Sequence, residues 1–409
     1  MSSYDVVVIG AGLAGLRAAR VLEDNDLSVL LLEKSHVVGG RLASRVVDGF
    51  VLDEGFQLIN PAYPELVATG ILESFDLRRF EPMVRFVRGN SSTTIVDPRW
   101  SPLEALRTLT SRTFRASDLA RTAKLFAHCG LGPVAAILGE DDCPTRVGLA
   151  RWGISTAMVD ECIEPFLRGT LLRDGLNDSW HYTQLLLRSF FRGRPGTHPS
   201  GIAALPQALA EKLRSTDIHV DEEVHGVTGS SVTTEERTYT CAGVIVATDP
   251  SAASILAETT ETSWFGQTTW WMSVPNECGG VGLRIDVTER RFSSALDVTS
   301  VARERSPSTR RLIAVPANGT YESREHDLAA ANYVARLYDV VANDVELVQK
   351  TVVAHALPRF DGPLRLAKTS RRGDLVLAGD YLQSPSIQGA LVSGRRAANE
   401  VLAALGQKK

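Results

Sequence analysis

Three glycines near the N-terminus restrict the fold of this chain more than any other feature. Gly10, Gly12 and Gly15 follow the spacing G-x-G-x-x-G and come directly after the apolar run at residues 6–9. A short continuous apolar run is typical of a central parallel strand, and residues 13–22 have the apolar spacing of a helix. The segment therefore predicts a strand, a tight turn and a helix, which is the opening unit of a doubly wound α/β domain.

Each glycine has a physical reason in such a unit. Gly10 permits the turn, Gly12 lets the backbone approach a pyrophosphate, and Gly15 lets the helix pack close to the strand. The phosphates would lie at the helix N-terminus. A second apolar strand at residues 27–34 carries Glu33 near its end. A carboxylate there can bind the hydroxyls of an unphosphorylated ribose, so the segment predicts a dinucleotide of the FAD or NAD type.

The next segment, EKSHVVGGRLASR at residues 33–45, places Gly39 and Gly40 directly before Arg41. An NAD-type unit would be expected to continue with another crossover helix and strand. The arrangement instead resembles the flavin-containing amine oxidoreductase and phytoene desaturase-like superfamily of FAD-dependent oxidoreductases. The resemblance implies that this segment lies along the FAD pyrophosphate, where small residues allow close approach and Arg41 is a forked donor to phosphate oxygens.

Three later segments resemble the same family in the same order. Asp53 and Gly55 lie in FVLDEGFQLIN, and GIAALPQALAEKL at residues 201–213 resembles the family segment that leads into an amphipathic helix. The strands after it, IHVDEEVHGV and GVIVATDP, resemble returning strands of the FAD domain. The third segment, at residues 375–405, resembles the second flavin-binding signature.

The chemistry of this C-terminal segment can be predicted from its residues. A strand ends at Gly379, and Asp380 can accept hydrogen bonds from the ribityl hydroxyls of a flavin. A helix then begins after the region of Pro385, with its N-terminus free to face the flavin. No cysteine lies within residues 375–400. A thioether link to the flavin is therefore excluded in that segment, and the FAD is expected to be noncovalent.

The resemblance also implies which residues contact the cofactor, with the backbone of Val224 against the adenine. The residues expected to bind FAD are Gly10, Ala11, Gly12, Ala14, Gly15, Glu33, Lys34, Gly40, Arg41, Leu42, Phe56, Gln57, Val224, Gly379, Asp380, Ile387, Gln388 and Ala390.

The chain length and the apolar periodicity predict two interleaved domains. At 409 residues the chain exceeds the size at which single cores stop growing. We expect an α/β fold with a Rossmann-type FAD-binding domain and an α+β substrate domain that contains a mixed or antiparallel sheet. Helical spacing covers residues 101–192, and strand alternation covers residues 82–96 and 267–316. The FAD-binding domain is expected to take residues 1–60, 196–255 and 355–409, and the substrate domain residues 61–195 and 256–354.

Candidate substrate contacts come from the strand TTWWMSVP and from the C-terminal segment. In the family that this chain resembles, such a sheet lies over the exposed face of the flavin. Successive side chains of a strand point to opposite faces, so only one of Trp270 and Trp271 can face the substrate cavity. The alternative is that both belong to the core. Tyr381 could contact the substrate, or it could be a packed residue at the domain interface.

The chain has one G-x-G-x-x-G motif, so a second nucleotide site for NAD(P)H is not expected, and electrons would come from an organic substrate. Amine-oxidising members often place a lysine near flavin N5, yet no lysine lies between Lys212 and Lys350. We expect an FAD-dependent oxidoreductase that transfers a hydride from an apolar or amine-bearing substrate to flavin N5. No catalytic acid or base is identified. The alternative is a non-redox flavoprotein, either an isomerase or a catalytically inactive FAD-binding protein.

Charge and composition exclude other classes. The net charge of −4 gives no basic footprint for nucleic acid. The five cysteines lack C-x-x-C spacing, which argues against a structural metal and for a reducing compartment. His219 and His225 have no carboxylate or cysteine partner at ligand spacing and are interpreted as surface or core residues. No apolar run reaches the ~20 residues of a membrane span, so we expect a cytoplasmic protein with at most peripheral membrane contact and with a small molecule as its partner.

Overall fold

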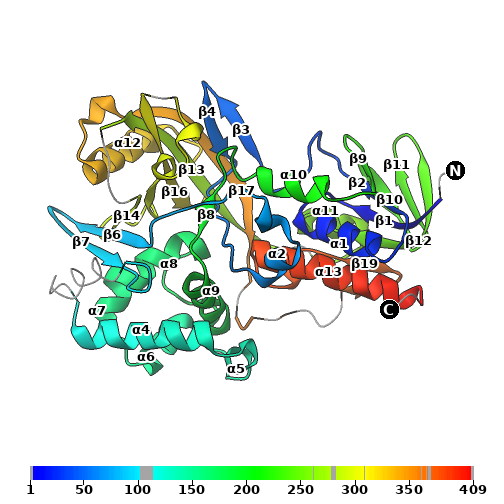
Figure 1. Cartoon of the computed structure of the whole chain (residues 1–409), viewed down its shortest axis with the longest axis horizontal. Helices are drawn as coiled ribbons and strands as arrows, with labels where there is room; N and C mark the ends of the chain where they lie inside the picture. The colour runs from blue at the N-terminus through cyan, green and yellow to red at the C-terminus, as the bar shows by residue number, and fades with distance from the viewer. Residues whose placement is uncertain are drawn as a thin grey trace.

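The computed structural model describes residues 3–101, 114–260, 262–277, 282–307, 309–360, 362–364, 366 and 370–406. Figure 1 shows an elongated molecule with one sheet toward each end. An eight-stranded sheet forms one body, and a seven-stranded sheet with a group of helices forms the other. We refer to them as the first and the second body. Among the described residues, no helix combines the length and the apolar character that crossing a lipid bilayer requires.

The first sheet is a doubly wound parallel sheet extended by antiparallel strands. β1 pairs in parallel with β2 and β12, and β2 pairs in parallel with β9. This arrangement confirms the predicted Rossmann-type α/β domain. In sheet order the strands are β10 (Val224–Val227), β11 (Ser231–Thr234), β12 (Thr238–Val246), β1 (Ser3–Ile9), β2 (Val29–Leu32) and β9 (Asp217–His219), with β19 (Leu375–Leu377) beside β12 and β18 (Arg371–Arg372) beside β19.

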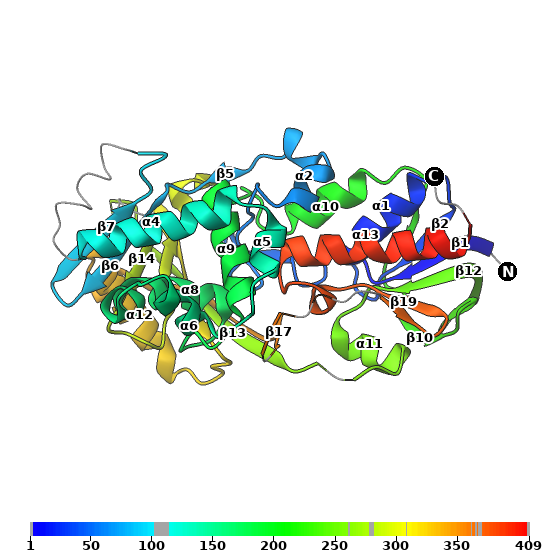
Figure 2. The same cartoon turned by 90° about the horizontal axis from the view of Figure 1, so that it is seen from below.

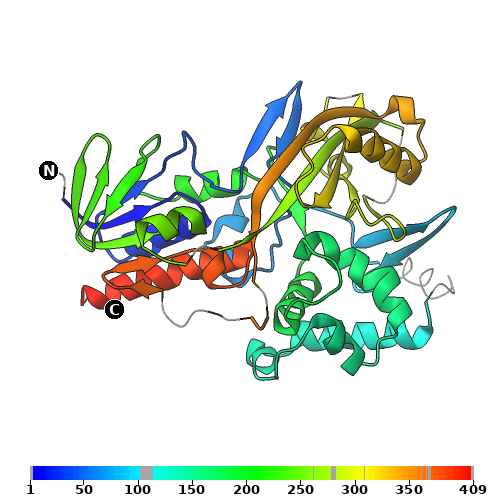
Figure 3. The ribbon, with the colours of Figure 1, turned by 180° about the vertical axis from the view of Figure 1, so that it is seen from behind.

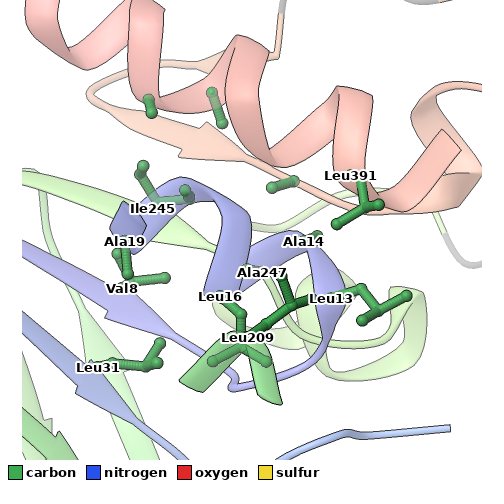
Figure 4. Packing of buried hydrophobic residues seen from close by; sticks show 14 of the residues in the cluster. Val8, Leu13, Ala14, Leu16, Ala19, Leu31, Leu209, Ile245, Ala247 and Leu391 are labelled. Atoms are coloured by element: carbon green, nitrogen blue, oxygen red, sulfur yellow. The ribbon is translucent and has the colours of Figure 1, made fainter. Parts of the chain in front are cut away.

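β1 is buried on both faces, as its apolar run predicts. Val6 and Val8 lie in the core on one face of the sheet, while Val7 and Ile9 lie in the core on the other face. Figure 4 shows the first of these cores, where Val8 lies beneath α1 and α13. The helices that contribute to this core are α1 (Leu13–Glu23), α2 (Pro64–Ala68), α10 (Ala204–Glu211) and α13 (Ile387–Ala404), and α11 (Pro250–Leu256) contributes to the opposite one.

α1 and α13 pack closely because small residues face each other. A Cβ atom on Gly394 would lie only 2.1 Å from the carbonyl oxygen of Ala14. α2 packs on the same body, where its Glu65 forms ion pairs with Arg17 of α1 and Arg395 of α13. The packing of the first body therefore extends beyond residue 60, whereas the predicted domain boundaries remain a prediction.

The second sheet is mixed. β14 runs parallel to β6, while all other described strand pairs of the sheet are antiparallel. Figure 3 shows that β13 and β17 are long strands reaching from this sheet toward the first body. α12 (Glu325–Tyr338) packs on the sheet through Tyr333 and Val334. In sheet order the strands are β17 (Glu346–Pro358), β13 (Trp264–Pro275), β16 (Arg310–Asn318), β15 (Ala295–Asp297), β14 (Leu283–Asp286), β6 (Met83–Arg88) and β7 (Ser91–Val96).

A group of helices lies below this sheet in the view of Figure 1, and Figure 2 shows it at the opposite end of the molecule from α1 and most of α13. Residues 102–113 of the expected helical region lie outside the described residues. Between α7 and α8 one turn, Val159–Ile163, is a π-helix. The helices are α4 (Ala116–Leu131), α5 (Val134–Leu138), α6 (Thr145–Arg151), α7 (Thr156–Met158), α8 (Glu164–Leu171) and α9 (Trp180–Arg192).

Short elements complete the described chain. Two small antiparallel pairs are β3 (Ser44–Val47) with β4 (Phe50–Asp53) and β5 (Arg78–Arg79) with β8 (Gly196–Thr197). The 3₁₀ turns are η1 (Ile71–Glu73), η3 (Val298–Ser300), η4 (Arg303–Arg305), η5 (Ala342–Asp344) and η6 (Asp380–Leu382).

Asp53, the last residue of β4, links the two bodies. Its Oδ1 accepts hydrogen bonds from the backbone N–H of Ile202 and the hydroxyl of Ser44, both at 2.8 Å. Its Oδ2 lies 3.0 Å from the guanidinium of Arg305, and its carbonyl oxygen accepts a 3.2 Å bond from the indole of Trp271. Arg305 has no exposed surface. The pair is therefore buried, and its charges are offset only by each other and by fixed hydrogen bonds.

We predict that Arg305→Met destabilises the protein by about 3–5 kcal/mol, because it leaves the buried Asp53 carboxylate without a counter-charge. Denaturant unfolding followed by circular dichroism measures the change. The double variant Asp53→Asn/Arg305→Met removes both charges and is expected to recover part of the loss. A single variant as stable as the wild-type protein would contradict this account.

Candidate cofactor and substrate site

A cavity of about 1740 Å³ lies between the two bodies. Pockets for one small molecule usually measure about 300–1,000 Å³, so this cavity has room for a cofactor and a further molecule. One end is bordered by the loops that follow β1 and β2. Ligands of doubly wound sheets bind outside the carboxyl ends of the strands, which is where these loops lie.

The start of α1 opens onto this end of the cavity. Gly10 has φ +99°, and a Cβ on Gly15 would lie 1.9 Å from the carbonyl oxygen of Gly10, so both positions require glycine for the turn and its packing. Gly12 borders the cavity, and a Cβ there would meet no atom within 4 Å. α1 has no side-chain cap and no acidic residue in its first turn. The backbone therefore offers an open helix N-terminus to a phosphate group.

Glu33 lies beside this helix start with 7% of its surface exposed. Its Oε2 accepts a 2.8 Å bond from the backbone N–H of Ala11, and its Oε1 accepts a 2.9 Å bond from the N–H of Ser35. Each carboxylate oxygen can accept a second hydrogen bond. Since Glu33 borders the cavity, its carboxylate is oriented to accept from hydroxyl groups of a bound molecule.

Arg41 and Asp380 meet in the cavity wall although 339 residues separate them. Nη2 of Arg41 donates to Oδ1 of Asp380 at 2.5 Å, and Nη1 donates to the carbonyl of Ala356 at 3.2 Å. The guanidinium also lies 5.5 Å from the ring centroid of Trp264, which stacks on His355. The fold therefore joins the Gly-Gly-Arg segment and the C-terminal segment at one place.

Most residues that the resemblance assigns to FAD border the cavity. They are Gly10, Gly12, Ala14, Glu33, Lys34, Gly40, Arg41, Leu42, Phe56, Gln57, Val224, Gly379, Asp380, Ile387 and Ala390. Ala11, Gly15 and Gln388 are not among the lining residues. Ala11 positions Glu33, Gly15 packs against Gly10, and Gln388 accepts a hydrogen bond from the N–H of Glu65. Direct contact of each residue with FAD remains a prediction.

These features fit FAD. The open space at Gly12 and the uncapped start of α1 suit a pyrophosphate, and Glu33 suits a ribose. The segment at Glu222 and Val224 borders the same end of the cavity, where the adenine is expected.

Hydrogen bonds hold this Glu222 segment in place. Glu222 accepts from the hydroxyls of Tyr239 at 2.7 Å and Thr234 at 3.0 Å, and Nδ1 of His219 lies 3.0 Å from its carboxylate. The expectation that His219 lacks a carboxylate partner was wrong, because the turn after β9 brings Glu222 back to it. Burial raises the pKa of Glu222, but these hydrogen bonds outweigh burial and lower the pKa below its ordinary value of 4.5.

The other end of the cavity is an apolar chamber, bordered by α4, α8, α9, β6, β7 and β14. No cavity-lining residue that these described elements contribute is charged. Cys162 of the π-helix also borders the chamber, and burial raises its pKa to about 12, so its thiol is neutral. Examples of the chamber lining are Phe86, Ile95, Phe126, Phe166, Phe190 and Ile285.

Trp270 and Trp271 do not take the predicted position. Both have no exposed surface, and neither borders the cavity. Trp270 packs edge-to-face on Phe292 and donates to Asp327 at 2.7 Å, while Trp271 lies on the opposite face of the sheet. The expectation that one tryptophan lines the cavity was wrong, and the alternative that both belong to the core is confirmed. Each face of β13 is covered by packed elements at this point of the strand.

Tyr381 also lies away from the cavity lining. It packs in the core on the second face of the first sheet, and its hydroxyl is buried without a hydrogen-bond partner among the described residues. Burial raises the pKa of Tyr381. The turn at Gly379 and Asp380 directs Asp380 toward the cavity and Tyr381 away from it, so this placement favours the packed alternative.

Gln267 is a site residue that the sequence analysis missed. It lies on β13 three residues before Trp270, borders the cavity and is 4% exposed. Its Oε1 accepts a 2.7 Å bond from the N–H of Phe56. Its amide nitrogen has no hydrogen-bond partner among the described residues. A side-chain amide in a strand of mostly aromatic, aliphatic and threonine residues is the signal that could have identified it.

Comparisons with known proteins agree with this geometry. The family model described as flavin containing amine oxidoreductase matches residues 13–402. A putrescine oxidase from Kocuria rosea is 52% identical over 64 residues, which are 16% of this chain and 13% of the relative. A carotenoid 3,4-desaturase from Haloarcula japonica is 38% identical over 90 residues, which are 21% of this chain and 18% of the relative. The chain thus matches less than a fifth of the length of each of these relatives.

Solved structures show the same fold. A cyclohexylamine oxidase from Brevibacterium oxydans superposes with a TM-score of 0.70 at 17% identity, over 98% of this chain and 99% of that chain. A putrescine oxidase bound to putrescine superposes with a TM-score of 0.71 at 17% identity, over the same shares of the two chains. At this identity the likeness concerns the fold.

We predict that Gly12→Val abolishes FAD binding and leaves the chain folded. The backbone at Gly12 has φ −74°, which valine can adopt, and the new side chain meets only the space that a pyrophosphate would need. Released flavin is measured after acid precipitation, and folding is measured by far-ultraviolet circular dichroism. The matched variant Gly15→Val should fail to fold, because its Cβ would collide with Gly10. Full FAD content in Gly12→Val would contradict the assignment.

We predict that Glu222→Gln reduces the stability of the protein near neutral pH and flattens its acid dependence. Because the folded-state pKa of Glu222 is lowered, its contribution is complete above the ordinary value of 4.5 and is lost as the pH falls through the lowered value. Denaturant unfolding of the flavin-free protein across this range gives the difference between variant and wild type. Glu236→Gln, at an exposed carboxylate of the neighbouring hairpin, is the control. A difference independent of pH would contradict the prediction.

Proposed function

Because the chain belongs to the flavin containing amine oxidoreductase family, we propose that it is an FAD-dependent oxidoreductase that removes a hydride from a C–H bond of an apolar organic substrate. The observation that carries the proposal is the continuity of the cavity, which joins a dinucleotide-binding end to a chamber without charged lining residues on the described elements that border it. A substrate bound in this chamber would lie next to the cofactor, against mostly apolar side chains.

FAD is the cofactor that the family implies, and several residues of this chain would hold it. Gly12 and the N-terminus of α1 would bind the pyrophosphate, and Glu33 would bind the adenosine ribose. Asp380 and Arg41 would bind the part of FAD between the pyrophosphate and the flavin ring. When bound, FAD supplies an acceptor for the hydride and its electron pair. Cys162, the described cysteine that borders the cavity, lies in the apolar chamber as a neutral thiol, which supports noncovalent binding.

The chamber favours an apolar substrate over an amine. An ammonium group placed among Phe126, Phe166 and Phe190 would lose its hydration and find no carboxylate on the elements that surround it, which costs free energy. Loss of a hydride to the bound flavin would leave a positive charge on the carbon, and loss of a proton from the neighbouring carbon to water would then give a neutral product with a double bond. The role of the chamber residues is to fix the orientation of the substrate.

The proposed compartment is the cytoplasm. Cys129, Cys143, Cys162 and Cys241 are free thiols, which is typical of proteins in reducing compartments. The proposed partner is the small-molecule substrate.

We predict that apolar candidate substrates bleach the flavin under anaerobic conditions and that Thr170→Asp slows this bleaching at least about tenfold. Thr170 lies on α8 in the chamber lining, and a carboxylate there would place an unpaired charge against an apolar substrate. Stopped-flow absorbance measures the rate, and the FAD content of the variant should equal that of the wild type.

Thr156→Asp is the matched control, because Thr156 is exposed on α7 and does not border the cavity. Equal rates of flavin bleaching in the two variants would show that the substrate does not bind in the chamber. Bleaching by amines but not by apolar candidates would overturn the proposed substrate class. An FAD-loaded protein that no substrate reduces, but that converts one without net oxidation, would favour the non-redox alternative.

A further inference from the structure

The arginine side chains that border the cavity in the described part of the chain differ in their partners. Arg41 forms an ion pair with Asp380. Arg99 forms a two-pronged ion pair with Asp97, with 2.9 Å between its Nε and Oδ1. Arg194 borders the same cavity and has no ion pair or hydrogen bond to any described residue. Of these three arginines, Arg194 is therefore the one whose positive charge is not paired with the carboxylate of a described residue.

The Arg194 side chain nevertheless has a defined position. Its guanidinium carbon lies 4.9 Å from the ring centroid of Trp100, which also borders the cavity. Its Nε has no exposed surface and no hydrogen-bond acceptor. Arg194 as a whole is half-buried, so the donors that a ligand in the cavity could reach are the terminal N–H groups of its guanidinium. Contact of the guanidinium face with the indole ring leaves these N–H groups, at the edge of the guanidinium plane, free to bind ligand oxygens.

The backbone that carries Arg194 is fixed on both sides. A Cβ on Gly193 would lie 2.5 Å from Oδ1 of Asn60, so this residue packs directly on the neighbouring segment. The carbonyl of Pro195 accepts a 3.0 Å bond from the N–H of Phe80. Gly196 exchanges two backbone hydrogen bonds of 2.9 Å with Ile59. The guanidinium is thus presented to the cavity from a rigid segment that directly follows α9, a wall of the apolar chamber.

We propose that Arg194 binds an acidic group, a carboxylate or a phosphate, carried at one end of the otherwise apolar substrate. The inference rests on the proposed function and narrows its substrate class to amphiphilic acids. A planar fork of N–H donors matches the geometry of two anionic oxygens, and a neutral hydroxyl or ester would leave the charge of Arg194 unpaired. The acidic group lies at Arg194, and the apolar chain occupies the chamber next to it.

The test uses the FAD-loaded protein and two matched pairs of probes: oleic acid with methyl oleate, and farnesyl phosphate with farnesol. Binding is measured by titration calorimetry and by the change in flavin absorbance. The wild-type protein should bind at least one acidic probe about tenfold or more tightly than its neutral partner. Arg194→Met should abolish this preference and leave the affinity for the neutral probe unchanged. Arg194→Lys should retain part of it, because lysine keeps the charge without the fork.

Arg192→Met is the control for charge. It removes the same charge two residues away, from an exposed side chain that does not border the cavity, and should keep the full preference.

A preference that survives in Arg194→Met, or no preference in the wild type, would overturn the inference while the proposed function stands. If the wild type binds neither the neutral nor the acidic probes, the apolar chamber is not the substrate site and both proposals fail. The pair that shows the preference distinguishes a carboxylate from a phosphate.

Discussion

The buried contact between Asp53 and Arg305 determines how the two bodies of this protein meet. One carboxylate oxygen binds the backbone just before α10 in the first body, and the other binds a guanidinium that belongs to the second body. Two charges removed from water are tolerated only where geometry and hydrogen bonds are nearly complete. The relative position of the bodies is therefore held by directional bonds, and the residues that follow Asp53 form part of the cavity wall between them.

The cavity combines two environments that one body alone could not provide. The end at Gly12 and Glu33 consists of backbone amides and a carboxylate at the edge of a parallel sheet, which suits phosphate and ribose groups. The chamber at the other end is lined by aromatic and aliphatic side chains of the second body. Gln267 belongs to the second body, and its hydrogen bond to Phe56 connects it to the segment that follows β4. Polar groups and apolar groups thus line opposite ends of one continuous space.

The nucleotide end was predictable from sequence because its requirements are local. Gly10, Gly12 and Gly15 satisfy backbone conditions that are set within one turn and one helix, and Glu33 needs only a strand of the right length before it. The chamber could not be predicted in the same way. Alternation along β13 correctly separates Trp270 from Trp271, but it does not tell which elements cover each face, and both faces are filled at that point. Arg194 was likewise not predicted, because its lack of a partner depends on where distant carboxylates lie.

The close packing of Gly394 against Ala14 has a consequence for the order in which the chain can mature on the ribosome. α13 is synthesised long after α1, yet the two helices pack on each other and share one core with β1. During synthesis, the apolar face of α1 has no α13 to cover it until the C-terminal helix has left the exit tunnel. Domains made of contiguous sequence can fold as they emerge, whereas this body completes its core only after α13 has been synthesised. The apolar face of α1 is therefore open to aggregation in the nascent chain during the interval between the synthesis of α1 and that of α13.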